Sequence, residues 1–496
     1  INPMIQKYIL TVIIFCFTFA SYGQKVVKQL KASVTKESME AKLRFLASDE
    51  LRGRDVGTPE IDIAALYIAE HYRANGLKTP PGLENYFQKV PLINSRPASV
   101  ATLTMGDKQA VIKKDLVFLD GKNGQYAADA VFLNYGLEAD YEGIDVKGKI
   151  VVVLPGNESI ASPRDYRNMS SEKQQLATEA GAVGLVELYK SRETPWRLIA
   201  NFLSRPGMKI GEQSDENRAF LVWLQDIDGT WENAFRSGQQ ALSVKLEGSS
   251  SESVTAKNVV GWIEGKDPKK KDEYLLMTAH YDHVGVRKSG EVQDSIYNGA
   301  RDNAIGVATL METVTFLSKN RPDYSVIFIA CTAEEKGLLG SRWYAENPLF
   351  PLEKTFFNFN TDGAGYNDTS IATVVGFERT SVNAKLAQSV KPFGLQVIGD
   401  PEPAQNLFDR SDNVNFAKQG IPALTFSCGF RAFDQELMKY YHQPADEVET
   451  LDMVYLEKYA RSFVYAAYLI ANTKEKPFWN DGDKYEKAGK ALYGIE

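Results

Sequence analysis

Short apolar runs alternate with amphipathic segments over the second half of the chain. Continuous apolar runs predict buried strands at 274–277, 325–331, 356–359 and 421–426. Apolar positions at helical spacing predict helices at about 304–318 and 452–472. Strands that alternate with helices indicate a layered α/β fold.

The first part of the chain has two further patterns. Apolar positions between Ser38 and Leu77 recur at helical spacing on both sides of a loop at 51–59, and Gly76 follows the second helix as its C′ residue. From Arg96 to Ser251 alternating and apolar segments predict strands, including those at 101–105, 130–133, 150–154 and 181–186, with a helix through 174–180 before the last of them. We therefore expect a discontinuous domain of 24–95 and 252–496, interrupted by a separate domain at 96–251.

Composition and charge narrow the class of protein. A chain of 496 residues exceeds what one core comfortably organises, and its contents of 44% hydrophobic and 24% charged residues are those of an ordinary globular protein. The net charge is −7 and no basic block stands out, so we expect no nucleic-acid partner. Oligomeric state does not follow from these features.

The amino-terminal segment resembles an export signal. Lys7 precedes an apolar run from Ile9 to Ala20, and Ser21-Tyr22-Gly23 has the small-x-small form of a cleavage site. We expect 1–23 to be a removed signal peptide, and the mature protein to be secreted or held in the cell envelope (periplasm). The run is too short to span a membrane, and no longer one follows, so we expect no stable membrane insertion after cleavage. Bulky Phe15 before Cys16 argues against a lipid anchor.

The remaining cysteines, Cys331 and Cys428, lie in apolar strand-like runs. Two cysteines in a long chain do not form a disulfide-stapled scaffold. We expect both to be buried free thiols.

Three of the four histidines belong to one pattern, and two of them lie in the stretch Thr278–Gly285. His280 follows the predicted strand 274–277, and ligands bind at the carboxyl ends of strands in open α/β sheets. We expect Asp282 to accept a hydrogen bond from one ring nitrogen of His280 and to leave the other nitrogen free for a metal. The alternative is a pair of surface histidines without a ligand.

Acidic residues and a further histidine follow other predicted elements. They are Asp302 in the loop 298–303, Glu334 and Glu335 after the strand 325–331, Asp362 after the strand 356–359, and His442 in 440–446. Each alone has an alternative as a solvated loop charge. Together they supply a bridging carboxylate, further nitrogen and oxygen ligands and a free base, which is the set that a hydrolytic site with two divalent ions needs. The mixture of imidazole and carboxylate suits zinc.

With these residues in this order, the chain resembles the co-catalytic dizinc aminopeptidase family, which includes bacterial leucyl-type aminopeptidases and glutamate carboxypeptidase. The resemblance runs from Leu46–Leu51 to Tyr441–Asp446. The segment 96–251 is similar to a protease-associated domain through Val146–Val151 and Ala180–Gly184. The resemblance implies a three-layer αβα sandwich around a mixed, mostly parallel sheet, with a β-rich insert that often covers part of the substrate cleft in this family.

The resemblance also implies a role for each site residue. Two zinc ions are expected, with Asp302 bridging them, His280 and Asp362 completing one site, and Glu335 and His442 completing the other. Glu334 would be the general base, which takes a proton from water and delivers it to the leaving amine. Tyr441 would stabilise the oxyanion, or would be a core tyrosine.

The chain departs from the family pattern at three positions, which are Arg301, Ile305 and Asn413. None of them removes a metal ligand, so they put substrate preference in doubt rather than catalysis. The leading hypothesis is an exported exopeptidase that removes amino-terminal residues from peptides. The alternatives are a carboxypeptidase or dipeptidase of the same fold, a glutaminyl-cyclase-like acyl transferase, and an inactive receptor-like binding protein.

Charge near the metals distinguishes an aminopeptidase from a carboxypeptidase. A carboxypeptidase needs a cluster of arginines to bind the terminal carboxylate, and the candidates are Arg287, Arg301, Arg410 and Arg431. An aminopeptidase needs free acidic groups to bind the terminal ammonium group, and Asp409 and Asp412 are candidates beside the pair Glu334 and Glu335. The family resemblance favours the aminopeptidase.

Overall fold

The computed structural model describes residues 24–159, 163–211, 218–238, 240–287, 294–363 and 365–495. The predicted signal peptide, 1–23, lies outside these residues. The chain divides into two compact units, of which the first contains residues 1–90 and 255–496 and the second contains 91–254. The sequence predicts the insert at 96–251.

The first unit is built on a mixed sheet in the order β18-β17-β19-β16-β12-β15-β11-β1. Its strands are β1 (Phe87–Arg96), β11 (Ser250–Ile263), β12 (Tyr274–His280), β15 (Ser325–Cys331), β16 (Thr355–Thr361), β17 (Ile371–Val375), β18 (Gln396–Ile398) and β19 (Ala423–Cys428). β12 is parallel to both β15 and β16, and β16 is parallel to β19. The antiparallel pairs are β11 with β15 and β17 with β19.

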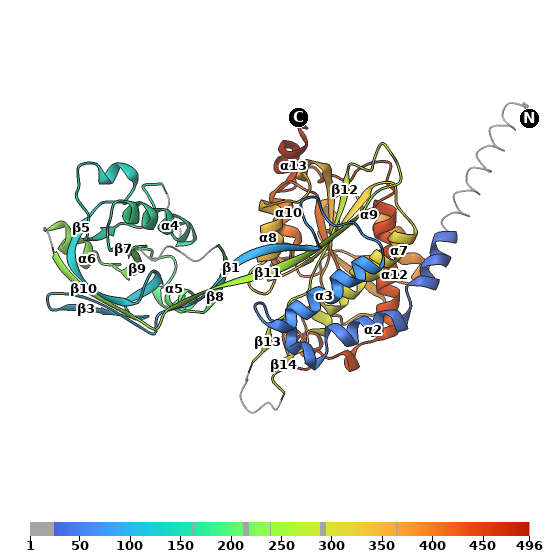
Figure 1. Ribbon diagram of the computed structural model, residues 1–496, viewed down its shortest axis with the longest axis horizontal. Helices are drawn as coiled ribbons and strands as arrows, with labels where there is room; N and C mark the ends of the chain where they lie inside the picture. The colour runs from blue at the N-terminus through green and yellow to red at the C-terminus, as the bar shows by residue number, and fades with distance from the viewer. Residues whose placement is uncertain are drawn as a thin grey trace, which may run out of the picture. The chain divides into compact units, whose positions relative to one another are not determined.

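Helices cover both faces of this sheet (Figure 1). On β15, Phe328 points toward Tyr72 of α3, whereas Ile327 and Ile329 pack with residues of α8 and α10 on the opposite face. Phe359 of β16 stacks on Phe463 of α12 with ring centroids 4.3 Å apart. The helices of this unit include α2 (Lys36–Leu46), α3 (Pro59–Ala74), α7 (Ile305–Lys319), α8 (Leu339–Glu346), α9 (Asn383–Val390), α10 (Asn413–Lys418), α11 (Gln435–Met438), α12 (Met453–Ile470) and α13 (Glu486–Tyr493). The three-layer α/β fold expected from the sequence is confirmed.

The parallel strands bring their carboxyl ends to one edge of the sheet. His280 at the end of β12 pairs in register with Cys331 at the end of β15, and Thr278 of β12 pairs with Asn360 of β16. The loops that leave these three strands therefore begin side by side, although residues 280 and 362 are far apart in the sequence. The predicted strands at 274–277 and 325–331 agree closely with β12 and β15.

The second unit has its own sheet, in the order β3-β2-β10-β5-β6-β7-β9-β4. Its strands are β2 (Val100–Met105), β3 (Lys108–Val111), β4 (Leu116–Asp120), β5 (Gly124–Phe132), β6 (Ile150–Val153), β7 (Gly184–Tyr189), β9 (Phe220–Gln225) and β10 (Gln240–Glu247), and its helices are α4 (Pro163–Glu179), α5 (Trp196–Leu203) and α6 (Thr230–Arg236). β8 (Gly207–Ile210) pairs with residues 92–95 of β1. The likeness of this segment to a protease-associated domain stays a prediction.

Two expectations from composition can be compared with the structure. Cys331 and Cys428 are both buried and free, as predicted. Within the described part of the chain, no helix combines the length and the apolarity that a bilayer crossing requires.

Candidate metal centre

Two groups of side chains that could hold a metal ion lie in the first unit. One contains His280, Glu334 and Asp362, and the other contains His283, Asp302, Glu335 and His442. Within each group the possible ligand atoms lie within 4.8 Å of one another. Every predicted ligand belongs to one of the groups, and no described residue of 91–254 belongs to either.

His280, the last residue of β12, is fully buried and is oriented by the loop that follows it. Its Nδ1 donates to the main-chain carbonyl of Asp282 at 3.2 Å, whereas the nearest carboxylate oxygen of Asp282 is 4.0 Å away. The predicted contact with the Asp282 carboxylate is therefore wrong in its acceptor atom, because the loop turns its main-chain oxygen back toward the ring. The carboxylate of Asp282 instead accepts the N–H groups of Glu334 and Glu335, at 3.0 and 3.2 Å.

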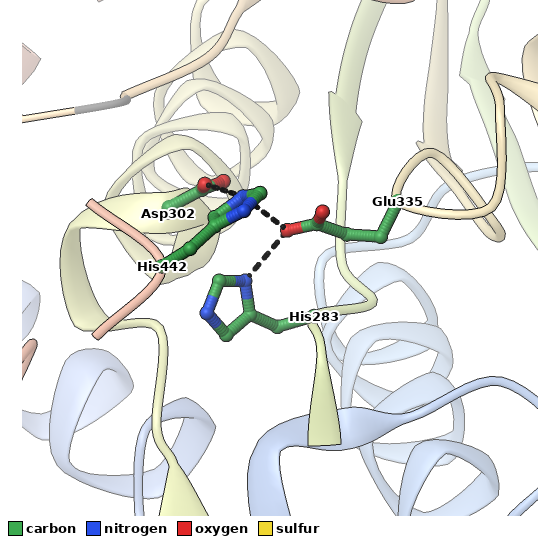
Figure 2. Close-up of side chains that lie close together, drawn as sticks. All are labelled: His283, Asp302, Glu335 and His442. Carbon is green, nitrogen blue, oxygen red and sulfur yellow. Dashed lines mark hydrogen bonds and ion pairs between the residues drawn. The ribbon is translucent and has the colours of Figure 1, made fainter. Parts of the chain in front are cut away.

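Asp302 lies between two histidines and offers one oxygen to each. Nε2 of His280 is 3.3 Å from Oδ1 of Asp302 and 3.4 Å from Oδ1 of Asp362. Nε2 of His442 is 3.1 Å from Oδ2 of Asp302 and 3.1 Å from Oε1 of Glu335 (Figure 2). A carboxylate that faces a separate ligand set with each oxygen has the arrangement of a bridging ligand.

These distances and donor types fit zinc. Tetrahedral zinc with ligands at about 2.0–2.2 Å places neighbouring ligand atoms about 3.3–3.6 Å apart, and the four contacts, at 3.1–3.4 Å, lie at or just below the lower end of this range. Because Nδ1 of His280 already donates to a carbonyl, a neutral ring would turn the lone pair of Nε2 toward two carboxylates. A cation between these atoms removes that repulsion.

Asp302 and Glu335 hold their charge at neutral pH. Burial opposes ionisation of Asp302, but the contacts with His280 and His442 outweigh it and keep the pKa of Asp302 well below its ordinary value. The pKa of Glu335 falls to about 2, because contacts with His283 and His442 outweigh the effects of burial and of the Asp302 charge. The pKa of His442 rises to about 10, because those same two carboxylates outweigh burial.

Glu334 has different surroundings from its neighbour Glu335. Its side chain belongs to the group of His280 and Asp362. Burial raises the pKa of Glu334 well above its ordinary value, and the charges of Asp362 and Asp412 add to this effect, against the opposing influence of His280. A carboxyl group with a raised pKa is suited to accept a proton and release it again.

The loop that carries Asp302 is held by Asp446, a residue without a predicted role. Asp446 is fully buried and accepts the main-chain N–H of Arg301 at 2.9 Å, the N–H of Asp302 at 3.2 Å and Nη1 of Arg301 at 3.1 Å. The Arg301 guanidinium lies 3.7 Å from the ring centre of Tyr440. The positive charge of Arg301, next to Asp302 in the sequence, is therefore paired with Asp446. The Asp302–Asn303 peptide bond is cis.

Arg54 is a second residue that the sequence did not single out. Its buried guanidinium donates to the carbonyls of Tyr281 at 2.8 Å, Asn298 at 2.7 Å and Gly299 at 3.0 Å, and also to that of Leu46. These acceptors belong to the loop after His280 and to the loop before Asp302. The only signal in the sequence is that Arg54 lies in a loop rich in turn residues.

The candidate ligands line one side of a pocket of about 400 Å³. The other walls include Tyr441, whose hydroxyl is 3.4 Å from Nη2 of Arg410 and whose ring stacks on His442 with centroids 4.2 Å apart. Burial raises the pKa of Tyr441, so its hydroxyl keeps its proton and can donate a hydrogen bond. The lining also includes the apolar residues Leu338, Val375, Leu407, Phe430 and Phe433.

The other two departures from the family pattern lie in buried positions. Ile305 is fully buried at the start of α7. Asn413 donates to the carbonyl of Phe408 at 3.1 Å and accepts from Thr425 at 2.9 Å. Neither side chain is among the residues that line the pocket.

The arginines that were candidates for binding a terminal carboxylate do not cluster at the pocket. Of the four candidate arginines only Arg410 lines the pocket, since Arg301 pairs with Asp446 and Arg431 pairs with Asp368 at 2.7 Å. The fourth, Arg287, lies near the ring of Tyr297.

The two candidate acids are no freer than the arginines. Asp409 lines the pocket, but its carboxylate pairs with Lys484 at 2.6 Å. Asp412 is fully buried, and burial raises its pKa to about 6. Neither candidate is therefore free to bind a terminal ammonium group, and the remaining acidic groups of the pocket are the carboxylates of the metal centre.

Comparison with known proteins adds independent findings. Residues 258–467 match the sequence model of the family described as Peptidase family M28. Aminopeptidase YwaD of Bacillus subtilis (strain 168) is 26% identical over 342 residues, which is 69% of this chain and 66% of that protein. The Vacuolar membrane protease of Saccharomyces cerevisiae (strain ATCC 204508 / S288c) is 33% identical over 142 residues, which is 28% of this chain and 13% of that protein. The matches therefore span less than two thirds of either relative's own length.

A solved structure has the same fold. The aminopeptidase from Aneurinibacillus sp. strain AM-1 superimposes with a TM-score of 0.51 at 22% identity, and the match covers 91% of this chain and 97% of that one. At this identity the likeness concerns the fold alone.

Proposed function

Because residues 258–467 match the model of Peptidase family M28, we propose that the chain is a zinc-dependent aminopeptidase that removes amino-terminal residues from peptides. The observation that carries the proposal is the position of Asp302 between His280 and His442, with Glu334 in the adjoining group. The relative YwaD, which bears the name of aminopeptidase, adds support.

The ligand geometry supports two zinc ions per chain. His280, Asp302 and Asp362 would hold one ion, and Asp302, Glu335 and His442 would hold the other. Zinc in such a pair lowers the pKa of water and polarises the scissile carbonyl.

The protein's own residues would carry the proton and orient the reacting groups. Glu334 would take a proton from the attacking water and deliver it to the leaving amine, since its raised pKa favours both steps. Asp282 would hold the two glutamates in place through their main-chain N–H groups. Tyr441 would donate its hydroxyl hydrogen to the oxygen that becomes negative.

The charges in the pocket favour an amino-terminal over a carboxy-terminal substrate group. A carboxypeptidase would need several arginines to bind the terminal carboxylate, and Arg410 is the single arginine among the described lining residues. An ammonium group can instead donate hydrogen bonds to the carboxylates that line the pocket. The apolar wall of Val375, Leu407, Phe430 and Phe433 would suit an apolar first side chain. The sequence of 1–23 supports export to the cell envelope or the medium.

Three forms of one apolar dipeptide test this proposal. The purified protein is loaded with zinc and given the free dipeptide, its amino-acetylated form and its carboxy-amidated form. We expect cleavage of the free and amidated forms and none of the acetylated form, with about two equivalents of zinc by elemental analysis. Cleavage of the acetylated form but not of the amidated form would identify a carboxypeptidase. Full activity after exhaustive chelation would exclude the metal mechanism.

A further inference from the structure

His283 lies three residues after His280 and belongs to the second candidate group, but it is not one of the ligands proposed above. Its side chain is fully buried, and its Nδ1 is 2.8 Å from Oε1 of Glu335 (Figure 2). The same oxygen is 3.1 Å from Nε2 of His442. Figure 2 shows both rings directed at this one carboxylate from different segments of the chain.

The distance indicates a hydrogen bond rather than shared ligation of one ion. Two ligand atoms of a tetrahedral zinc ion lie about 3.3–3.6 Å apart, whereas an N–H donor and a carboxylate oxygen lie at about 2.7–2.9 Å. The contact of His283 at 2.8 Å has the second value. His442 lies between the two ranges at 3.1 Å from Glu335, and it is equally far from Oδ2 of Asp302. The short distance of His283 therefore indicates a donor to Glu335.

The other ring nitrogen identifies the tautomer. Nε2 of His283 is buried and has no hydrogen-bond partner among the described residues. If the hydrogen were on Nε2, the protein would bury an unpaired N–H and would set a lone pair against the carboxylate. With the hydrogen on Nδ1, Glu335 accepts it and only a lone pair remains unpaired, which costs less.

The surrounding backbone holds the ring in this orientation. The main-chain N–H of His283 donates to the carbonyl of Arg54 at 3.3 Å. Gly299 leaves room for the ring, since a Cβ atom there would lie 2.6 Å from Cγ and Cδ2 of His283, and its φ of 59° also favours glycine. The orientation of the imidazole is thus fixed before a metal ion binds.

We propose that His283 is a positioning residue that orients Glu335 for its metal ion by donating the Nδ1 hydrogen to Oε1. A free glutamate side chain loses rotamer freedom when it binds a metal, and a partner that holds it beforehand lowers that cost. This inference rests on the proposed metal function. It adds that the ion held by Asp302, Glu335 and His442 depends on a residue that is not its ligand.

Two substitutions separate positioning from ligation and from packing. His283→Asn keeps an N–H donor near the position of Nδ1, whereas His283→Leu keeps the bulk and removes the donor. Cobalt(II) affinity is measured by competition with a chelator on the full chain, and the absorption spectrum of the bound cobalt is recorded. We expect the affinity for one of the two cobalt ions to fall by about 10–100-fold in His283→Leu and by only a few-fold in His283→Asn. The cobalt spectrum of His283→Asn should be unchanged. His71→Leu, a histidine substitution outside the centre, should leave both affinities unchanged.

Other outcomes overturn the proposal. Equal loss in both variants, together with an altered cobalt spectrum, would make His283 a ligand. Unchanged affinity in the Leu variant would reduce His283 to packing. Failure of the proposed function is distinguishable, since it would show as a wild-type protein that binds cobalt but cleaves no peptide.

Discussion

At the scale of single residues, two adjacent glutamates differ because their neighbours differ. Glu335 lies 2.8 Å from Nδ1 of His283 and 3.1 Å from Nε2 of His442, and these contacts lower its pKa to about 2. Burial instead raises the pKa of Glu334 well above its ordinary value. The first environment favours a permanent anion that binds a cation, and the second favours a group that gains and loses a proton.

The glutamine variants of these two residues should therefore behave differently. Glu334→Gln should retain both zinc equivalents and lower turnover by about 10²–10⁴, the usual contribution of a positioned acid or base. Glu335→Gln should lose zinc, because it removes an anionic ligand. Elemental analysis and turnover of the two variants under the same conditions check this prediction, and the reverse pattern would exchange the two roles.

At the scale of elements, Arg54 connects three segments through carbonyl groups. It lies at the end of the 3-10 helix η1 (Asp49–Arg54), and its guanidinium donates to the chain after β12 and to the chain before the short helical turn η3 (Ala300–Ala304). No carboxylate lies within ion-pair distance of it among the described residues, and burial lowers its pKa to about 10. The segments that carry His280 and Asp302 are therefore held together by a residue that touches neither ligand.

Arg54→Met should destabilise the first unit strongly. The change leaves four carbonyl groups without their donor, so we expect the free energy of unfolding to fall by more than about 3 kcal/mol. Arg52→Met is a matched control, since Arg52 is two residues away, its side chain is 55% exposed and its ion pair with Glu60 is long at 3.6 Å. That variant should lose less than about 1 kcal/mol in denaturant unfolding. Similar losses in the two variants would contradict the assigned role.

His71 connects α3 to α7 far from the candidate ligands in the sequence. Its Nε2 donates to the carbonyl of Met311 at 2.9 Å, and burial outweighs this bond and lowers the pKa of His71 from 6.5 to about 4. Since the folded state disfavours the proton, the unfolded state binds it first as the pH falls. The contribution of His71 to stability is present above about pH 6.5 and is lost progressively down to about pH 4.

His71→Gln should reduce the pH dependence of stability. Between pH 7 and pH 5 the wild-type free energy of unfolding should fall by about 2 kcal/mol more than that of the variant. Urea unfolding of both proteins at the two pH values, without metal in either sample, measures the difference. Equal slopes would show that His71 titrates normally in the folded protein.

At the scale of the whole molecule, the metal centre is contained in one of the two units. All candidate ligands lie between residues 280 and 442, and the second unit is 91–254. β1 and β11, through which the chain leaves and re-enters the first unit, are neighbours in the sheet, and Val260 donates its N–H to the carbonyl of Tyr86 at 2.7 Å. Pairing between β1 and β11 therefore joins the two parts of the first unit directly, without the residues between these strands.

Replacement of residues 91–254 by a short Asn-Gly turn should leave the metal centre intact. We expect the shortened protein to unfold cooperatively and to bind the same number of zinc equivalents with affinities within a few-fold of the full chain, because no ligand or ligand-orienting residue is removed. Calorimetry and zinc titration of the two proteins check this. A folded shortened protein that binds no zinc would show that the second unit contributes to the centre.

The sequence by itself determined the features that depend on local pattern. Apolar runs located β12 and β15, because a strand that is buried on both faces has mostly apolar side chains. The order of motifs placed His280, Asp302, Glu334, Glu335, Asp362 and His442 in one site, and the structure brings them together. Both depend on residues within a few positions of one another, or on motifs that are specific as a set.

Tertiary structure alone decided which neighbours these residues have. Asp282 was expected to touch His280 with its carboxylate, yet the turn of its loop directs that carboxylate to Glu334 and Glu335. The side chains of Arg54, His283 and Asp446 form hydrogen bonds with residues up to 245, 52 and 145 positions away, so no spacing in the sequence indicates these contacts. A hydrogen bond requires its donor and acceptor to be placed within a few tenths of an ångström of the right distance, and only the packing at the edge of the sheet places them so.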